Sequence, residues 1–198
     1  RYVSEYNKLK SGAMIEFQGK EYNLPQMQKF MVSSDREVRR LANKATWDFY
    51  KNHDKEFGDI YDKLVKVRTK MAQKLGYENF VPLAYKRMQR LDYTAKEISK
   101  YRLELKKYLV PLAEKYRLKQ MERIGIKDPH FYDYSINFID GNPVPNGDTE
   151  TLTNEAERMY HEMNEDIGQR FTYLKEHGHL DLEARKGKQG GGYAVSYT

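Results

Sequence analysis

The sequence of 198 residues contains no cysteine. This absence excludes a disulfide-stapled scaffold, a zinc site built from thiolates and a cysteine nucleophile. It also suits a reducing compartment, so we expect a cytoplasmic protein. Long hydrophobic runs are missing too, because no uninterrupted apolar segment approaches the roughly 18 residues that a membrane-spanning helix requires. We therefore expect no membrane partner.

Positive charge exceeds negative charge only slightly in this sequence. The chain has 35 basic and 29 acidic residues and a formal net charge of +6. A nucleic-acid-binding protein usually gathers its positive charge on one face, whereas here the two signs alternate, as in Asp35-Arg36-Glu37. This alternation is typical of solvated helix surfaces, and we expect no nucleic-acid partner. With 39% hydrophobic and 32% charged residues, the composition is that of a globular domain.

The beginning of the sequence predicts a small hairpin followed by a helix. Apolar and polar residues alternate around Gly19, which predicts a β-hairpin over 13–24, closed by Pro25. Ser34 and Glu37 have the spacing of a capping box, which marks the start of a helix. The apolar face expected on this helix consists of Val38, Leu41, Ala45 and Phe49.

Helices are expected to dominate the region 34–176. A second capping box, formed by Thr94 and Glu97, opens another long amphipathic helix, which Pro111 should kink or end. The segment 139–149 is rich in proline and glycine and predicts a loop. A last long helix should follow this loop, with one apolar face that consists of Ala156, Met159, Met163, Ile167, Phe171 and Leu174.

The end of the sequence, 177–198, predicts a glycine-rich loop and then a strand over 193–198. The strand pattern has only begun when the sequence stops at Thr198, and the sequence starts at Arg1 without a methionine. We therefore expect a single partial segment of a larger protein. The strand could pair with an ordinary partner strand, or it could add an extended peptide to its exposed edge.

Three short motifs suggest chemistry that their details do not support. HEMNE at 161–165 is close to the zinc-peptidase motif H-E-x-x-H, but Glu165 stands where the second histidine is required. His177 and His179 are interpreted as a polar helix terminus favoured by the helix dipole. GKQGGG at 187–192 has its Gly-Lys at the wrong end of the loop for phosphate binding.

The segment LDLEARKGKQGGGY resembles a pattern of the oligoendopeptidase F and thimet oligopeptidase family, L-D-L-x-x-R-x-G-K-x-x-G-G, which lies just upstream of the family's zinc motif. Three other blocks, in the same order, also resemble oligoendopeptidase F-type sequences. They are SSDREVRRLA (33–42), LGYENF (75–80) with YKRMQRLDY (85–93), and YDYSINFIDGNPVPNGD (132–148). The residues that fall on the first pattern are Leu180, Asp181, Leu182, Arg185, Gly187, Lys188 and Gly191.

This resemblance implies a zinc metallopeptidase that cleaves short peptides in a deep channel between two largely helical halves. The family holds zinc with the two histidines of H-E-x-x-H and a downstream glutamate, and the glutamate of the motif is the general base. The implied fold is mainly α, with long amphipathic helices packed as part of a helical zincin-type peptidase, a small N-terminal β-hairpin and a C-terminal edge strand. The remainder of the peptidase chain is the implied partner of this segment.

The resemblance also implies that substrate backbone lies against the strand after the glycine cluster. The implied substrate contacts are Gly191, Gly192, Tyr193, Ala194 and Val195. Because H-E-x-x-H is absent, the resemblance places the zinc ligands and the general base beyond Thr198. We expect no catalytic residue and no metal ligand in these 198 residues, and no hydrolysis by them alone.

An alternative from another functional class is a self-contained basic helical module that binds a protein or nucleic-acid partner. The two hypotheses predict different surfaces. A peptidase segment should leave an apolar face uncovered. A self-contained module should have a sealed core and one contiguous positive face.

Overall fold

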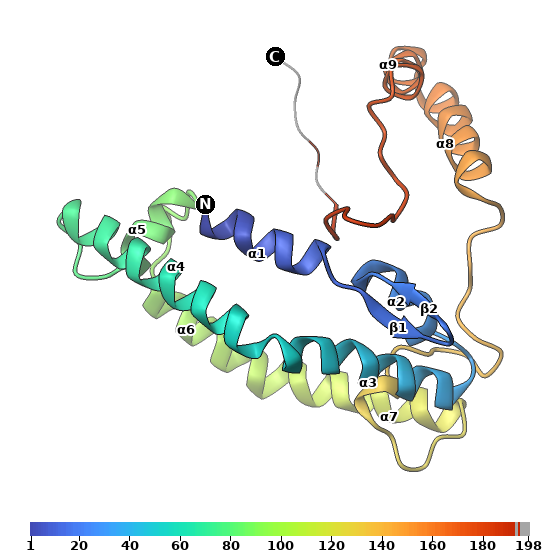
Figure 1. The fold of residues 1–198 in the computed structure, drawn as a ribbon, viewed down its shortest axis with the longest axis horizontal. Helices are drawn as coiled ribbons and strands as arrows, with labels where there is room; N and C mark the ends of the chain where they lie inside the picture. The colour runs from blue at the N-terminus through green and yellow to red at the C-terminus, as the bar shows by residue number, and fades with distance from the viewer. Residues whose placement is uncertain (193, 195–198) are drawn as a thin grey trace.

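The computed structural model describes residues 1–192 and 194, and it is mainly helical with one two-stranded sheet. In chain order the elements are α1 (Tyr2–Ser11), β1 (Ile15–Phe17), β2 (Lys20–Tyr22), α2 (Leu24–Met31), α3 (Arg36–Asn52), α4 (Asp54–Lys74), α5 (Phe80–Arg87), α6 (Ala95–Glu104), the π-helical turn η1 (Leu105–Leu109), α7 (Val110–Arg123), the 3-10 turn η2 (Phe131–Asp133), α8 (Thr149–Met163) and α9 (Glu165–Glu176) (Figure 1). The prediction of a mainly helical fold with a small hairpin is confirmed.

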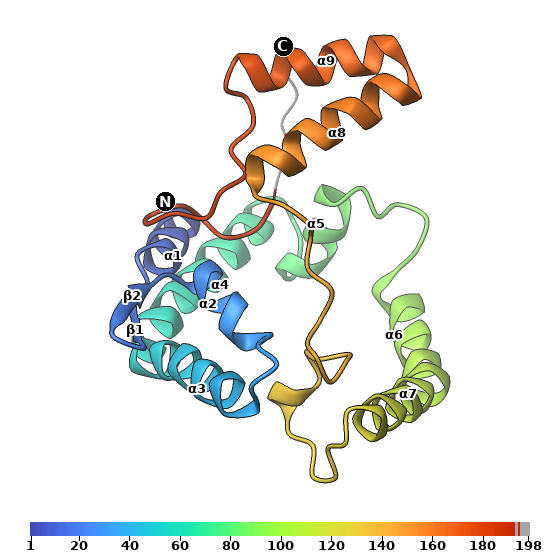
Figure 2. The same ribbon diagram turned by 90° about the vertical axis from the view of Figure 1, so that its right-hand side faces the viewer.

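The helices form an open arc, which is best seen in Figure 2. One side of the arc consists of α1 to α4, and the other is the rod made by α6, η1 and α7. Helix α5 lies between the two sides at one end, and the segment 124–148 joins them at the other. Helices α8 and α9 pack against each other and project from the arc as a hairpin.

The β-hairpin lies where the sequence predicts it. Its strands are antiparallel, with Ile15 opposite Tyr22 and Phe17 opposite Lys20. Gln18 and Gly19 form the connecting turn with φ of 50° and 75°. A two-residue turn of type I′ requires this left-handed conformation at both residues. Ile15 and Phe17 are buried, so the hairpin contributes one face to the main core with α2 and α3.

Helices α1, α2 and α5 are absent from the sequence prediction. Pro25 does more than close the hairpin, because it occupies the first turn of α2, where its missing N–H breaks no helical hydrogen bond. Asn23 caps that helix: its side-chain oxygen accepts from the Gln26 N–H at 2.9 Å, and the Gln26 side chain accepts from the Asn23 N–H at 3.0 Å. The N-L-P-Q sequence is thus a capping box with proline in the first turn.

The helix predicted from Ser34 begins one residue later than expected. Asp35 is its cap, and the carboxylate accepts from the N–H groups of Glu37 and Val38 at 2.8 and 3.2 Å. The predicted apolar face is also wrong in part, because Leu41 is 40% exposed. A partly polar face is buried instead, because Arg39 is drawn into the core by an ion pair with Asp133. The buried residues of α3 are Arg39, Ala42, Asn43, Thr46 and Phe49.

The predicted start of α6 is confirmed. Pro111, which is expected to kink or end the helix, is accommodated by a widened turn just before it. Thr94 and Glu97 form the reciprocal capping box. The N–H of Val110 bonds to the carbonyl of Leu105, five residues back, at the end of the π-helical turn. A proline in a helix lacks its N–H and crowds the preceding turn. The π-turn accommodates this defect just before Pro111, so the rod continues into α7.

The predicted last long helix is wrong, because the chain reverses at Asn164 to form the α8–α9 hairpin. Asn164 is extended, with φ −169° and ψ 131°, and its side chain accepts from the Ile167 N–H at 3.2 Å as the cap of α9. Gly168 lies so close to His161 of α8 that a Cβ atom there would be 2.4 Å from the imidazole ring. Glycine at this position therefore allows the two helices to approach.

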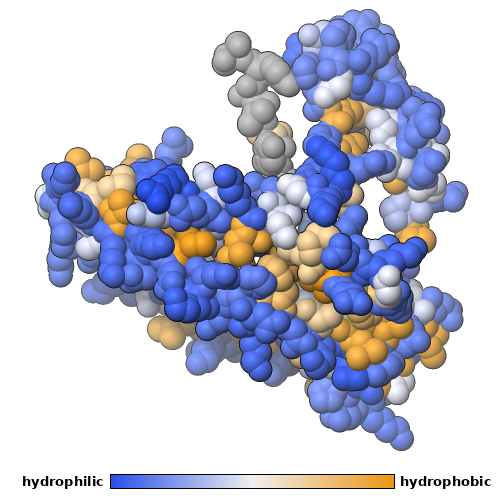
Figure 3. All heavy atoms as spheres, in the orientation of Figure 1, coloured by the Kyte–Doolittle hydropathy of each residue, from blue (hydrophilic) through white to orange (hydrophobic). Residues whose placement is uncertain are grey.

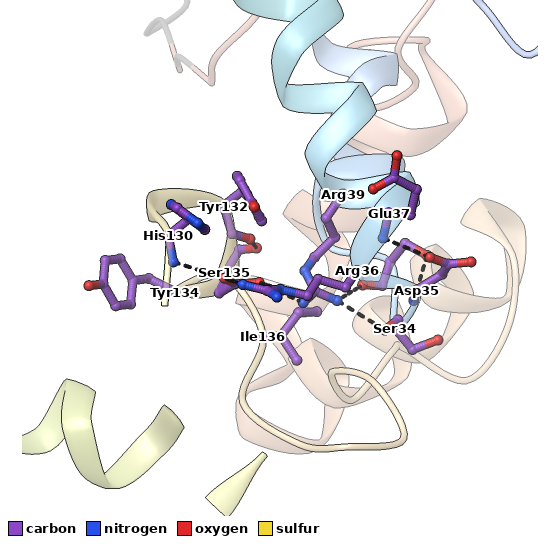
Figure 4. Close-up of polar contacts among 12 residues, drawn as sticks. Ser34, Asp35, Arg36, Glu37, Arg39, His130, Tyr132, Tyr134, Ser135 and Ile136 are labelled. Atoms are coloured by element: carbon purple, nitrogen blue, oxygen red, sulfur yellow. Dashed lines mark hydrogen bonds and ion pairs between the residues drawn. The ribbon is translucent and has the colours of Figure 1, made fainter. Parts of the chain in front are cut away.

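A buried ion pair joins the start of α3 to the segment around η2. Asp133 is fully buried, and its carboxylate accepts from Arg39, which is 2% exposed, at 3.0 Å. Arg36 adds a bidentate contact to the same carboxylate at 3.0 and 2.9 Å. Figure 4 shows both arginines reaching from the first turns of α3 toward the segment that carries His130 and Tyr132. Two parts of the chain about a hundred residues apart are thereby held together.

The same segment also binds the end of α7. The Gln120 side chain donates to the carbonyls of Tyr134 and Ile136, and Arg123 donates to the carbonyl of Asn137 at 3.0 Å. Ile136 is buried in a small apolar cluster on this side of the arc. Segment 128–142 therefore connects the two sides of the arc.

The ion pair sets the protonation of Asp133. Burial of the carboxyl raises its pKa, but hydrogen bonds from Arg36, the His130 N–H and Arg39 outweigh this effect and hold the pKa below its ordinary value of 3.8. The carboxylate is therefore ionised in the folded protein at neutral pH.

We predict that Asp133→Asn strongly destabilises the protein. The substitution leaves the buried Arg39 guanidinium without its counter-charge, a change that typically costs about 3–5 kcal/mol. Urea denaturation followed by circular dichroism should show a correspondingly lower unfolding free energy. Asp128→Asn is the matched control, because the Asp128 side chain is 91% exposed and only its backbone carbonyl accepts from Arg36. A loss of stability no larger than that of the control would contradict the role of the pair.

We also predict that the gap in stability between the wild type and Asp133→Asn closes in acid. The folded-state pKa is lowered, so this contribution is complete above the unfolded value near 3.8 and is lost as the pH falls through the folded pKa. Unfolding free energies measured from pH 7 to below pH 3 should converge at the acid end. A gap that stays constant over this range would show that ionisation of Asp133 does not matter.

Candidate functional site

The loop after α9 is held in shape by a network centred on Asp181. The carboxylate accepts a bidentate pair of hydrogen bonds from Arg185, at 2.5 and 2.9 Å, and a third from the Lys188 ammonium at 3.0 Å. Lys188 also donates to the backbone carbonyls of Asp181 and Glu183, both at 2.7 Å. Gly187 turns the chain between the two cations with φ 75°. The loop is thus folded around a single carboxylate.

This network explains the charged residues of the recognised pattern. Hydrogen bonds from Arg185 and then Lys188 hold the pKa of Asp181 far below its ordinary range, so the carboxylate is charged at neutral pH. Both cations are already paired inside the loop. Lys188 therefore has a structural role in this loop.

The loop returns to the hairpin end of the chain and is fixed there. The side-chain NH₂ of Asn23, the cap of α2, donates to the backbone carbonyl of Arg185 at 2.8 Å across 162 positions of sequence. Asn23 is 2% exposed and Arg185 is exposed, so this contact is partly buried. Gly190 lies against the same helix, where a Cβ atom would be 3.1 Å from Cγ of Pro25. Figures 1 and 2 show this return of the chain from α9.

The predicted substrate-contact residues follow directly after this anchored turn. Gly191 and Gly192 are exposed, and a Cβ atom at either would meet none of the residues that the structure describes within 4 Å, so among these residues their backbone borders open space. Gly191 has φ 104°, a conformation that glycine adopts without strain. Ala194 is exposed and has no regular secondary structure. Tyr193 and Val195 lie outside the described residues, as does the expected strand apart from Ala194.

The HEMNE motif is part of the contact between α8 and α9. One imidazole nitrogen of His161 lies 3.0 Å from Glu165, and the other lies 3.1 Å from the Thr172 hydroxyl. Thr172 donates to Glu157, which also pairs with Lys175. In residues 1–192 and 194, no three histidine, aspartate or glutamate side chains are grouped so that they could hold a metal ion.

His177 and His179 form an aromatic stack with Tyr173. Their ring centroids lie 4.0 and 5.9 Å from that of Tyr173, and one nitrogen of His177 lies 2.9 Å from the Tyr173 carbonyl. His177 is the C-terminal cap position of α9, as the interpretation of a polar helix terminus requires. Within the described part of the chain, no helix is long and apolar enough to cross a membrane.

Asn23 is the residue of this region that the sequence analysis misses. Its capping role has a local signal, since Gln26 follows three positions later. Its contact with Arg185 has no such signal, because a single side-chain donor to a distant carbonyl leaves no pattern in the sequence.

Comparison with solved structures identifies close matches over nearly the whole chain. A structure of PZ peptidase A with an inhibitor shares 45% sequence identity, has a TM-score of 0.92, and matches over 97% of this chain and 34% of its own length. A structure described as an oligoendopeptidase F from Bacillus anthracis str. Ames shares 40% identity, with a TM-score of 0.91, over 98% of this chain and 36% of its own. A further oligoendopeptidase F structure shares 43% identity, with a TM-score of 0.91, over 96% of this chain and 34% of its own.

The chain spans about a third of the length of each of these structures. No curated protein matches it. The model of peptidase family M3 matches residues 29–198, which include the described segment 128–142, the α8–α9 hairpin and the Asp181 loop. The resemblance found in the sequence is thus confirmed by comparison, and the chain belongs to peptidase family M3.

Proposed function

We propose that the chain is part of a zinc-dependent oligoendopeptidase that hydrolyses peptide bonds in short peptides. In this proposal the segment supplies one wall of the substrate channel and the edge against which substrate backbone lies. The zinc ligands and the general base belong to residues outside this sequence. The absence of cysteine supports a cytoplasmic location for the enzyme.

The observation that carries the proposal is the anchored turn before Gly191. The loop is fixed by Asp181 and by Asn23, yet no described residue covers the backbone at Gly191 and Gly192. An extended peptide can hydrogen-bond to such a backbone without meeting a side chain. We place substrate contacts at Gly191, Gly192, Tyr193, Ala194 and Val195.

The described residues do not fit a zinc site. His161 and Glu165 come closest to the required motif, but His161 lies at the end of one helix and Glu165 at the start of the next. The two imidazole nitrogens of His161 already contact Glu165 and the Thr172 hydroxyl. Zinc in a peptidase needs three protein ligands and an open position for water. We therefore assign no catalytic step to residues of this chain.

An uncovered apolar stripe supports the assignment to a larger enzyme. Along the rod of α6, η1 and α7, Tyr101, Tyr108 and Tyr116 follow one another at seven and eight residues, about two helical turns, and they are 59%, 62% and 63% exposed. Figure 3 shows hydrophobic patches between hydrophilic ones on the face of the molecule that it presents. Exposed apolar area of this extent favours a segment that packs on more protein over a self-contained module with a sealed core. We propose that the remainder of the peptidase covers this stripe.

A peptide-hydrolysis assay tests the proposal. The 198-residue chain, incubated with zinc and a quenched fluorescent peptide, should show no turnover. The protein encoded by the complete natural reading frame should cleave the same peptide, and a chelator should abolish the cleavage. Chelator-sensitive turnover by the 198-residue chain would contradict the absence of the zinc site. A complete protein that holds zinc but cleaves no peptide would contradict the peptidase.

We further predict that Gly191→Val impairs the complete enzyme. A β-branched residue at φ 104° is strained and shifts the backbone that contacts substrate. We expect kcat/KM to fall by roughly tenfold, equivalent to about 1.4 kcal/mol, and steady-state kinetics with a short peptide measures this change.

Gly178→Val is the matched control for backbone strain. Gly178 also has a positive φ, of 68°, and a Cβ atom there would meet no described residue within 4 Å, but it follows α9 and precedes the anchored loop. This control should lose stability while kcat/KM stays near the wild-type value. Equal kinetics for Gly191→Val and the wild type would indicate that Gly191 is a passive linker.

A further inference from the structure

We infer that Asn23 is a positioning residue for peptide binding. Its side-chain NH₂ group holds the Arg185 carbonyl by a hydrogen bond and so fixes the loop that precedes the candidate binding residues. This inference rests on the proposed function, because it concerns the segment that follows Arg185. Asn23 lies at the other end of the sequence from that segment, and it belongs to the cap of α2.

The Asn23 side chain makes two separate contacts with its two polar atoms. The oxygen accepts from the Gln26 N–H and caps α2. The NH₂ group donates to the Arg185 carbonyl at 2.8 Å. The first contact stabilises a local helix, whereas the second determines where a distant loop lies. A substitution can therefore remove one and keep the other.

The second contact has no substitute in the described residues. Among residues 1–192, no other hydrogen bond or ion pair joins the loop 181–192 to the part of the chain before α8. The remaining contact with α2 is the close approach of Gly190 to Pro25. The Asp181 network is internal to the loop, so it preserves the loop's shape and does not fix its place on the protein.

The position of the candidate binding residues depends on this anchor. Gly191 is six residues beyond Arg185, and the Lys188 N–H donates to the Arg185 carbonyl at 3.1 Å, which closes the turn that leads to Gly191. A displacement of Arg185 is therefore transmitted to Gly191 and Gly192. A binding edge must be held in place before the peptide arrives, because ordering it on binding would weaken affinity.

Asn23→Asp separates the two contacts in the complete natural protein. Aspartate caps a helix as well as asparagine does, so α2 keeps its cap. The carboxylate cannot donate to the Arg185 carbonyl and repels its oxygen. Gln26→Ala is the matched control, because it removes the Gln26 side-chain half of the capping box and leaves the Asn23 NH₂ contact in place.

Limited trypsin digestion gives a readout that does not depend on peptidase activity. Arg185 and Lys188 are trypsin sites inside the anchored loop. Mass spectrometry should detect cleavage after these residues about tenfold faster in Asn23→Asp, and at the wild-type rate in Gln26→Ala. Unchanged cleavage in Asn23→Asp would overturn the anchor. Gly190→Ala is a second variant, because its Cβ would press on Pro25, and it should accelerate the same cleavage.

Steady-state kinetics then tests the role in binding. Asn23→Asp should raise KM for a short peptide about tenfold with kcat within a factor of two, and Gln26→Ala should leave both near the wild type. Faster trypsin cleavage with an unchanged KM would overturn the role in substrate positioning. A wild-type protein that cleaves no peptide would instead refute the proposed function and this role with it, while the trypsin result would still decide whether Asn23 anchors the loop.

Discussion

The buried contact between Arg39 and Asp133 determines how this chain closes on itself. A buried guanidinium or carboxylate alone is strongly unfavourable, so each requires the other to be in place. Arg39 also donates to the carbonyls of Ser33 and Ser34, and the Arg36 bidentate contact completes the carboxylate's partners. The pair can form only when the segment around η2 lies on the start of α3. Everything between these two points, from α4 to α7, is thereby constrained to run out and return as an arc.

The second closure of the chain is of a weaker kind. After the α8–α9 hairpin, the loop is joined to α2 through one neutral hydrogen bond from Asn23 to Arg185. A neutral hydrogen bond contributes about 0.5–1.5 kcal/mol net, whereas disruption of a buried ion pair typically costs several times more. The arc is thus fixed by the buried ion pair, which is costly to break. The loop is fixed by a hydrogen bond whose contribution to stability is small. The loop is therefore held in place less strongly than the arc is closed.

The sequence predicts those features whose causes are local. The Gly19 turn and the Thr94 cap depend on neighbouring residues, and both lie where the sequence indicates. The apolar face of α3 is mispredicted because periodicity counts apolar residues, and the partner that buries Arg39 lies 94 positions away. The division between α8 and α9 has a local signal in Asn164, but apolar residues continue at helical spacing across it. That spacing indicates one helix and conceals the reversal.

The candidate site shows the same division between local and distant causes. The resemblance selects Asp181, Arg185 and Lys188, and the structure shows how they act together: two cations fold the loop around one carboxylate. None of these side chains is proposed to touch substrate. The proposed contacts are made by backbone, and backbone atoms leave no side-chain signature in a sequence. The glycines do indicate such a surface. They allow the positive φ at Gly191, and they leave the main chain accessible because they have no side chain. Chemistry-bearing motifs therefore could not have located this site, whereas the loop that positions it could be recognised.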